Sequence, residues 1–342
     1  MKKILAVVLC FFFFACVAAL SHAAGDEGFE SQHKIRKNIS RLDDPRYVHD
    51  ATVDLRFAGE DAVPYLTDAL NNPEASGNFK ITALEILGDI KSPAAVDAIL
   101  VSLKDPITSV RRASAIALGK IGDAKAIEGL KACLNDIDAH TRYLAARALV
   151  KINDPSLVDT FIPLLNDYDV NVKITAIEGL GKLRAARAID ELSKLADNPD
   201  ENVRINMAIA LYNIGSKDIL PTVNRLLEDR SPAVREAALA AMGQAKDPSS
   251  VPYLIKVARQ DRKNLRLTAT IALGDIGTPE VIPTLKTLLT DESTDVRLAA
   301  LNGLNKIGTG ECKEAIRSVS KDESMKVRRA SQAMLGQSEP AR

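Results

Sequence analysis

Histidine and cysteine are the residue types of this chain best suited to metal binding and nucleophilic chemistry, and both are scarce. The four histidines are His22, His33, His49 and His140, and their spacing does not match that of metal ligands. The sequence also contains no CxxC pair, no glycine-rich phosphate loop and no GxSxG motif. We therefore predict no catalytic residues, no metal and no cofactor, and we interpret the histidines of the mature chain as capping or surface residues.

The first 23 residues have the pattern of a secretory signal peptide. Two lysines at positions 2–3 precede an apolar run over 4–20, and the SHA triplet at 21–23 matches a small-x-small cleavage site. We expect cleavage near Ala23 and a periplasmic or secreted protein. Two alternatives are a retained membrane anchor, for which the run is barely long enough, and a lipoprotein attached at Cys16.

The charge balance argues against a nucleic-acid partner. The chain has 45 basic and 45 acidic residues, whereas nucleic-acid binders carry a basic excess. Tryptophan is absent and aromatic residues make up 4% of the chain, which suits helices packed through aliphatic side chains. We expect no insertion into a membrane once the signal peptide is removed.

A repeat of 31 residues organises almost the whole mature chain. One apolar position recurs at that interval, at Leu87, Leu118, Leu149, Leu180, Leu211, Met242, Leu273, Leu304 and Leu335. A fixed period of this length indicates stacked helical pairs. The sequence therefore predicts an all-α solenoid of about ten 31-residue helical hairpins in a single domain over residues 24–342. The first repeat, about 29–57, is degenerate, and regular repeats run from about 58 to 338.

Each repeat contains a first helix, here called the A helix, and a second, the B helix. Short polar residues precede the B helices and predict N-caps at Ser76, Asp138, Asp169, Asp200, Ser231, Ser293 and Ser324. The A helices are expected to begin at the pairs 92–93, 154–155, 247–248 and 278–279, where a capping residue precedes proline. Glycines after the repeated leucine, such as Gly119 and Gly122, are predicted to end the B helix.

A basic residue marks every B helix, and an acidic residue precedes it at a constant distance. The bases are Lys80, Arg111, Arg142, Lys173, Arg204, Arg235, Arg266, Arg297 and Arg328. Six residues before them stand Asp105, Asp136, Asp167, Asn198, Asp229, Asp291 and Asp322, and only position 260, a glutamine followed by Asp261, departs from the pattern. A basic stripe for phosphates is one interpretation. Because the acids recur in step with the bases, we favour a ladder of ion pairs between stacked repeats.

Cys133 and Cys312 are the cysteines of the mature chain. Two cysteines in an exported protein suggest a disulfide. They lie about six repeats apart, however, at A-helix positions that are usually small and buried. We predict that both are packed free thiols.

The pattern V-R-x-x-A-x-x-A-L-G-x-I-G resembles the short HEAT-like repeat of phycobiliprotein lyases. The resemblance covers about residues 45–338. It implies antiparallel helix pairs stacked into a right-handed superhelix, with B helices lining the concave side. It also implies an alternative function, a lyase- or chaperone-like protein that handles a tetrapyrrole or another prosthetic group, although the signal peptide counts against a cytosolic lyase.

One face of the B helices departs from the repeat pattern and is the predicted partner-binding site. Residues four apart on a helix share a face, and here many are aliphatic where the family pattern has a charged pair. The predicted contact residues are Arg112, Ile116, Lys120, Tyr143, Arg147, Lys151, Ile174, Glu178, Ile205, Ile209, Leu267 and Ile271. Two other interpretations are that these side chains pack as core against the next B helix, or that they are isolated surface hydrophobes.

The function that these patterns favour is non-catalytic. An apolar strip edged by charge suits a protein segment or peptide, so we predict a scaffold or adaptor in the bacterial envelope that binds a partner protein in its groove. The sequence does not identify the partner and gives no oligomeric state. A third hypothesis is a structural spacer attached to the envelope.

Overall fold

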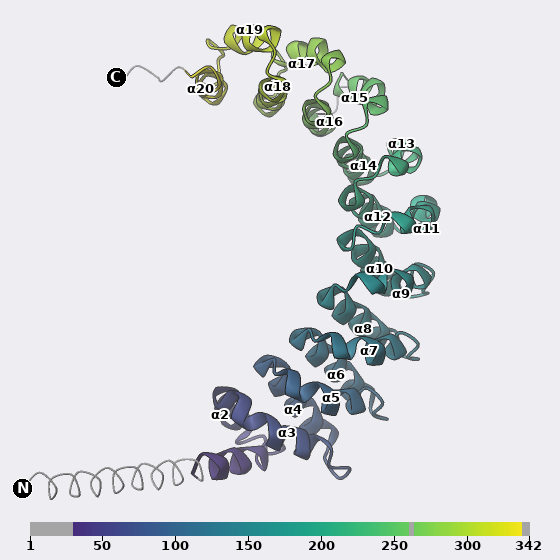
Figure 1. Ribbon diagram of the computed structural model, residues 1–342, viewed down its shortest axis with the longest axis vertical. Helices are drawn as coiled ribbons and strands as arrows, with labels where there is room; N and C mark the ends of the chain where they lie inside the picture. Colours follow the sequence, from purple (N-terminus) through teal and green to yellow (C-terminus); the bar gives the residue numbers. More distant parts are fainter. Residues whose placement is uncertain (1–29, 260–262, 337–342) are drawn as a thin grey trace, which may run out of the picture. The chain divides into compact units, whose positions relative to one another are not determined.

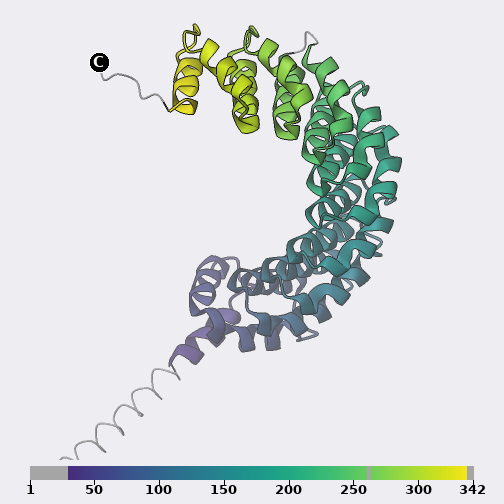
Figure 2. The ribbon, with the colours of Figure 1, turned by 45° about the horizontal axis from the view of Figure 1, so that its top comes forward.

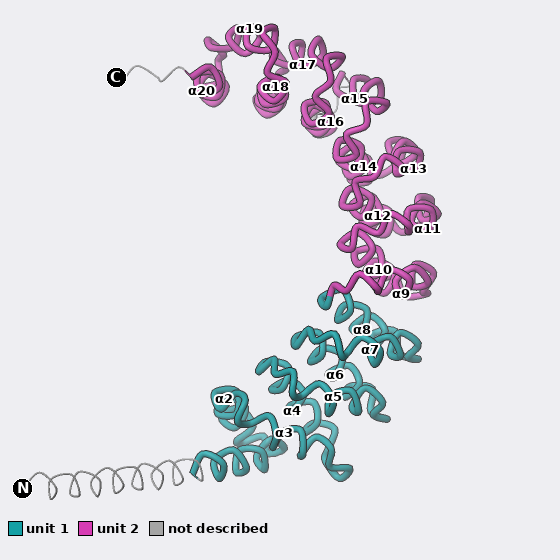
Figure 3. The backbone as a smooth tube through the Cα atoms, in the orientation of Figure 1, with its two compact units in different colours: residues 1–152 teal, residues 153–342 magenta. Residues whose placement is uncertain are grey.

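The computed structural model describes residues 30–259 and 263–336, and the predicted signal peptide lies outside this part of the chain. These residues form helices and connecting turns with no strand. Contacts group the chain into two compact units, residues 1–152 and 153–342 (Figure 3). The predicted α-solenoid is confirmed within each unit, and the prediction of one domain over 24–342 remains a prediction.

Unit 1 contains a helical segment at 30–39 followed by B and A helices in alternation (Figure 1). Its B helices are α2 (Val48–Ala58), α4 (Gly77–Ile90), α6 (Thr108–Ile121) and α8 (Ala139–Ile152). Each A helix opens with a 3-10 turn: η1 (Gly59–Ala62) and α3 (Val63–Leu70), η2 (Pro93–Ala95) and α5 (Val96–Ser102), and η3 (Ala124–Ala126) and α7 (Ile127–Cys133).

Unit 2 repeats the same alternation. Its A helices are η4 (Pro155–Leu157) with α9 (Val158–Leu164), η5 (Ala186–Ala188) with α11 (Ile189–Ser193) and η6 (Lys194–Asp197), η7 (Lys217–Ile219) with α13 (Leu220–Leu226), η8 (Pro248–Ser250) with α15 (Val251–Ala258), η9 (Pro279–Val281) with α17 (Ile282–Leu288), and α19 (Gly310–Ser318). Its B helices are α10 (Val170–Lys182), α12 (Glu201–Ile214), α14 (Pro232–Ala245), α16 (Lys263–Ile276), α18 (Thr294–Ile307) and α20 (Met325–Met334).

The two kinds of helix form two layers in each unit. Successive B helices pack directly on one another, α4 on α6 on α8 in unit 1 and α10 through α18 in unit 2. In unit 2 the B helices lie along the inner side of that unit's bend and the A helices along the outer side (Figures 1 and 2). The repeated leucine fixes this packing, because Leu118 and its counterparts up to Leu304 are fully buried between the layers.

The predicted caps account for most of the helix boundaries. The Ser76 hydroxyl accepts from the Phe79 amide, and the Asp200 carboxylate accepts from the Asn202 amide. Ser293 and Ser324 also occupy N-cap positions, but their side chains accept no capping hydrogen bond. At the other end of α6, Gly122 has φ of 74°, in the left-handed region that favours glycine, and it ends the helix as predicted.

Gly119 does not end the helix, so that part of the prediction is wrong. It lies inside α6, and a Cβ atom at this position would stand 3.0 Å from both Cα and Cβ of Ala148 on α8. Gly243 is still more crowded, because its Cβ would lie 2.6 Å from Ala272 Cβ and 2.9 Å from Ala272 Cα. The glycine after the repeated leucine therefore lets neighbouring B helices approach closely.

We predict that Gly243→Ala destabilises the protein although alanine is the better helix former. The added methyl group meets the backbone of α16, which cannot move aside as a flexible side chain could, and such overpacking costs about 1–3 kcal/mol. Gly310→Ala is the matched control, because a Cβ there meets nothing within 4 Å; we expect it to be neutral or slightly stabilising. Urea unfolding measures both, and an equal effect of the two changes would contradict the close-packing role.

Candidate partner-binding surface

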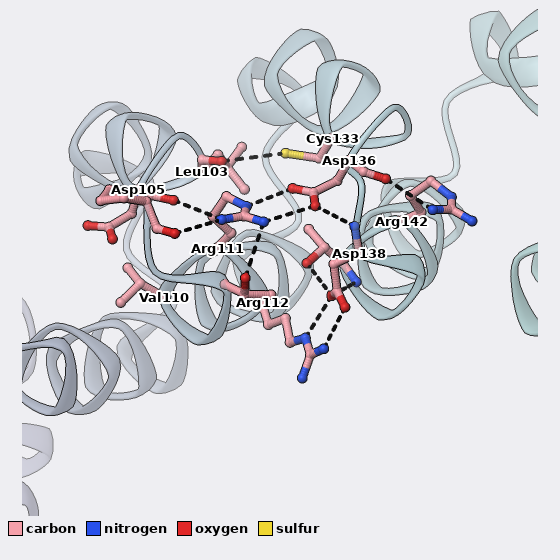
Figure 4. Close-up of polar contacts among 12 residues, drawn as sticks. Leu103, Asp105, Val110, Arg111, Arg112, Cys133, Asp136, Asp138 and Arg142 are labelled. Atoms are coloured by element: carbon pink, nitrogen blue, oxygen red, sulfur yellow. Dashed lines mark hydrogen bonds and ion pairs between the residues drawn. The ribbon is translucent and has the colours of Figure 1, made fainter.

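Each basic residue of the ladder joins its own repeat to the next. Arg111 of α6 donates through Nε and Nη2 to the two carboxylate oxygens of Asp136, at 2.7 and 3.0 Å (Figure 4). Its Nη1 donates to the backbone carbonyl of Asp105 at 3.0 Å. Asp136 also accepts from the backbone amide of Asp138 at 2.8 Å. One guanidinium thus connects two A–B turns through a bidentate ion pair.

The same connection recurs between residues 25 positions apart. It is present at Lys80–Asp105 and Arg111–Asp136 in unit 1, and at Arg204–Asp229, Arg266–Asp291 and Arg297–Asp322 in unit 2. These structures confirm the predicted ladder at five junctions and leave no row of free bases for phosphates there. The name "ladder" is used below for these five pairs.

The ladder pairs lie largely out of solvent, which shifts the pKa of their carboxyl groups. The Arg111 guanidinium lowers the pKa of Asp136, although burial opposes the shift. Burial by itself would raise the pKa of Asp229, but hydrogen bonds from Arg204 and from the Ser231 amide outweigh it, and the pKa is lowered. Both carboxylates are therefore ionised in the folded protein over the neutral range.

The predicted partner-binding residues of unit 1 lie on the neighbouring helices α6 and α8. Ile116 is 42% exposed at the centre of its helix face, while Arg147 and Lys151 are exposed and Tyr143 is half-buried. Arg147 donates to the Tyr143 hydroxyl at 2.9 Å and lies over its ring, 5.5 Å from the centroid. An aliphatic side chain on α6 therefore accompanies an aromatic platform on α8.

Two charged residues of this face already have partners within unit 1. Arg112 pairs with both carboxylate oxygens of Asp138, at 2.6 and 2.8 Å, and this pair lowers the pKa of Asp138. Lys120 donates to Asp89 at 2.6 Å, and Arg56 lies 2.7 Å from the other oxygen of Asp89. A carboxylate from a partner protein would have to displace these contacts to bind Arg112 or Lys120.

The predicted residues of unit 2 lie on α10, α12 and α16. Ile209 and Ile271 are 45% and 47% exposed, and Glu178 is exposed. Ile174, Ile205 and Leu267 are half-buried. Between α12 and α16, helix α14 presents Glu236, Ala240 and Gln244 at the corresponding positions, so the apolar positions of this face are interrupted at α14.

None of the twelve predicted residues is buried. The interpretation of these side chains as buried core therefore does not describe the structure. The half-buried members support the next helix through their stems, and the exposed members offer surface to a partner. The structure does not test whether a partner binds there.

Other exposed apolar residues were not predicted. Ile137 and Tyr168 are almost fully exposed, and each directly follows a ladder-row acid, Asp136 or Asp167. Other repeats have proline or a charged residue at this position. The repeat alignment contains the signal that could have identified them, because an apolar residue at a turn position that is usually proline or charged stands out.

The described residues contain no group of three or more metal-ligand side chains. His140 is exposed, with its ring 5.6 Å from that of Tyr143, in agreement with the predicted surface role. Cys133 and Cys312 are buried free thiols, as predicted, and burial raises the pKa of Cys133 to about 11. Among the described residues, no helix has the length and apolar content needed to cross a membrane.

The chain belongs to the HEAT repeat family. Four overlapping matches to HEAT repeats cover residues 63–140, 130–211, 189–267 and 253–336. The crystal structure of an engineered protein is similar, with a TM-score of 0.53 and 20% identity, over 89% of this chain and 98% of the engineered one; at this identity the likeness shows the fold alone. A search of curated proteins found no match. The repeat family and the fold suggest a non-enzymatic protein-interaction scaffold.

We predict that Asp229→Asn costs about 3–5 kcal/mol at pH 7, because it leaves a buried Arg204 without its counter-charge. The two side chains are only 8% and 4% exposed. Since the folded pKa of Asp229 is lowered, its stabilising contribution is present above the unfolded value of about 4 and is lost as the pH falls through the folded value. Urea unfolding should therefore show the difference from the unmodified protein shrinking below about pH 4.

Asp159→Asn is the control for this change. Asp159 pairs with Arg187 at 2.9 Å, but both side chains are mostly exposed, so the loss should be below about 1 kcal/mol. Equal losses for the two variants would show that the ladder pairs do not stabilise the repeat junctions.

Proposed function

We propose that this protein is a non-catalytic scaffold that holds a segment of another protein against its B helices. The observation that carries the proposal is the exposure of Ile116, Ile209 and Ile271 on the face where the repeats differ from one another. Stability of the stack does not require aliphatic residues to remain in solvent there. Exposed apolar side chains rimmed by charge support recognition of a protein segment.

The surroundings of Tyr143 support an anchor site in unit 1. Its ring is held from one side by Arg147 and from another by the exposed His140. Tyrosine and arginine are the residues that most often dominate protein interfaces, because they combine a large apolar area with directional hydrogen bonds. Ile116 on the neighbouring helix adds apolar contact area.

The charges of this face indicate what the segment should carry. Arg112 and Lys120 are engaged by Asp138 and Asp89, whereas Arg147 and Lys151 are exposed on α8. An amphipathic segment fits this arrangement, with an apolar side chain against Ile116 and a carboxylate near Arg147. The tetrapyrrole-handling alternative finds no specific support in the described residues.

We also propose that the scaffold acts outside the cytoplasm, in the bacterial envelope or after secretion. The basic start, the apolar run over 4–20 and the SHA triplet support this placement. The mass of the mature protein purified from its native cells tests it. We expect a chain that starts near Ala24, and a mass that includes residues 1–23 or a lipid on Cys16 would contradict cleavage at this site.

We predict that Tyr143→Ala combined with Arg147→Glu weakens capture of the partner at least tenfold, because it removes the aromatic platform and reverses a charge. Both positions are accessible, so helical circular dichroism should not change. Tagged protein would be expressed in its native cells, and the proteins retained by the unmodified chain would be quantified against those retained by the double variant.

The matched control combines Tyr65→Ala and Lys125→Glu, the same two changes placed on α3 and η3 of the A layer. Capture should persist in this control. Unchanged capture by the B-layer variant, or equal loss in both variants, would reject the proposed face.

A further inference from the structure

One basic residue of the repeat register has no acid to complete its pair. Arg235 on α14 is equivalent to Arg204 and Arg266, whose partners stand 25 residues further along the chain. For Arg235 that position is Gln260, which carries no charge. Residues 260–262 lie outside the described residues, so the geometry below rests on their neighbours alone.

Arg235 keeps the half of the ladder contact that belongs to its own repeat. Its Nη1 donates to the carbonyl of Asp229 at 2.6 Å and to that of Arg230 at 3.2 Å. Its Nε atom is buried and has no hydrogen-bond partner. In Arg204 the same atom donates to a carboxylate at 2.7 Å. The guanidinium of Arg235 is therefore oriented like those of the ladder, with its pairing edge vacant.

This edge faces a cavity of about 600 Å³ between α13, α14 and α15. Leu227, Leu239, Val257 and Leu265 supply apolar walls, and Tyr253 and Lys256 lie on the exposed side. Asn224 also lines the cavity, and its buried Oδ1 atom has no partner. Two buried polar atoms without partners in one cavity are costly, which favours a ligand that satisfies them.

The charges around the cavity favour an anion. Arg235 and Lys256 oppose Glu228 and Asp229 along the lining. Asp229, however, is neutralised by Arg204 at 2.7 Å. With Arg204 included, three positive groups face two negative ones. A single carboxylate would restore the balance that the ladder has at the other junctions.

We propose that this cavity binds a carboxylate presented by a protein segment, which pairs with Arg235 as Asp229 pairs with Arg204. The Nε and Nη2 edge of a guanidinium matches the two oxygens of a carboxylate. The apolar walls fit the short stem that carries such a group. The site lies on the side of the A–B turns, separate from the B-layer face, and it does not depend on the proposal for that face.

Selective NMR of the full chain, with arginine labelled at the guanidinium nitrogens, tests this site. The Arg235 Nε–H signal is identified by its loss in Arg235→Gln. Two blocked tripeptides serve as probes, one with a central aspartate and one of alanines with a free C-terminal carboxylate, and an amidated alanine tripeptide is the neutral control. We expect a saturable downfield shift with at least one acidic probe, at a Kd on the order of 1 mM.

The two acidic probes distinguish an acidic side chain from a chain terminus as the natural source of the carboxylate. Lys256→Glu provides a second variant that should fold normally, because Lys256 is exposed; we expect it to weaken the acidic probe about tenfold. Arg230→Gln removes an exposed arginine one turn away, and binding should be unchanged. No saturable shift with either acidic probe, an equal response to the neutral peptide, or unchanged binding by Lys256→Glu would overturn the proposal.

Discussion

The ion pair between a B-helix arginine and the aspartate of the following A–B turn is the contact on which the repeat architecture depends. Arg111 shows why: its guanidinium holds two turns through Asp136 and the carbonyl of Asp105. Leucine packing is non-directional and would tolerate sliding of one repeat on the next. A bidentate pair has a fixed geometry, so it sets the register in which each repeat meets its neighbour.

A register fixed in this way leaves other positions free to vary. The buried leucines, the ladder residues and the close Gly243–Ala272 contact form the framework of each unit. Ile116 and Tyr143 take no part in it, and they differ from repeat to repeat. The B-layer face can therefore acquire a binding preference without loss of the fold. The cavity at Arg235 follows from the same logic, because it lies where a framework residue is changed.

The sequence predicted the framework well because the framework repeats. The 31-residue period located the helix pairs, and the constant offset between bases and acids indicated the ladder. Single-sequence reasoning failed where one residue type has two uses: Gly119 was expected to end a helix but permits close packing against Ala148. Asp138 was predicted as an N-cap, and it indeed accepts from the Thr141 amide, but it also engages Arg112. The period does not encode that second contact.

Photo-crosslinking from defined positions tests the central claim most directly. A benzophenone amino acid would replace Ile116, Ile209 or Ile271 on the B layer, and Lys125, Lys217 or Glu280 on the A layer, in protein expressed in its native cells. These six residues are all exposed. We predict crosslinks to one and the same partner from the B-layer positions and none to it from the A-layer positions. Equal crosslinking from both layers, or crosslinks from the A layer alone, would contradict the account.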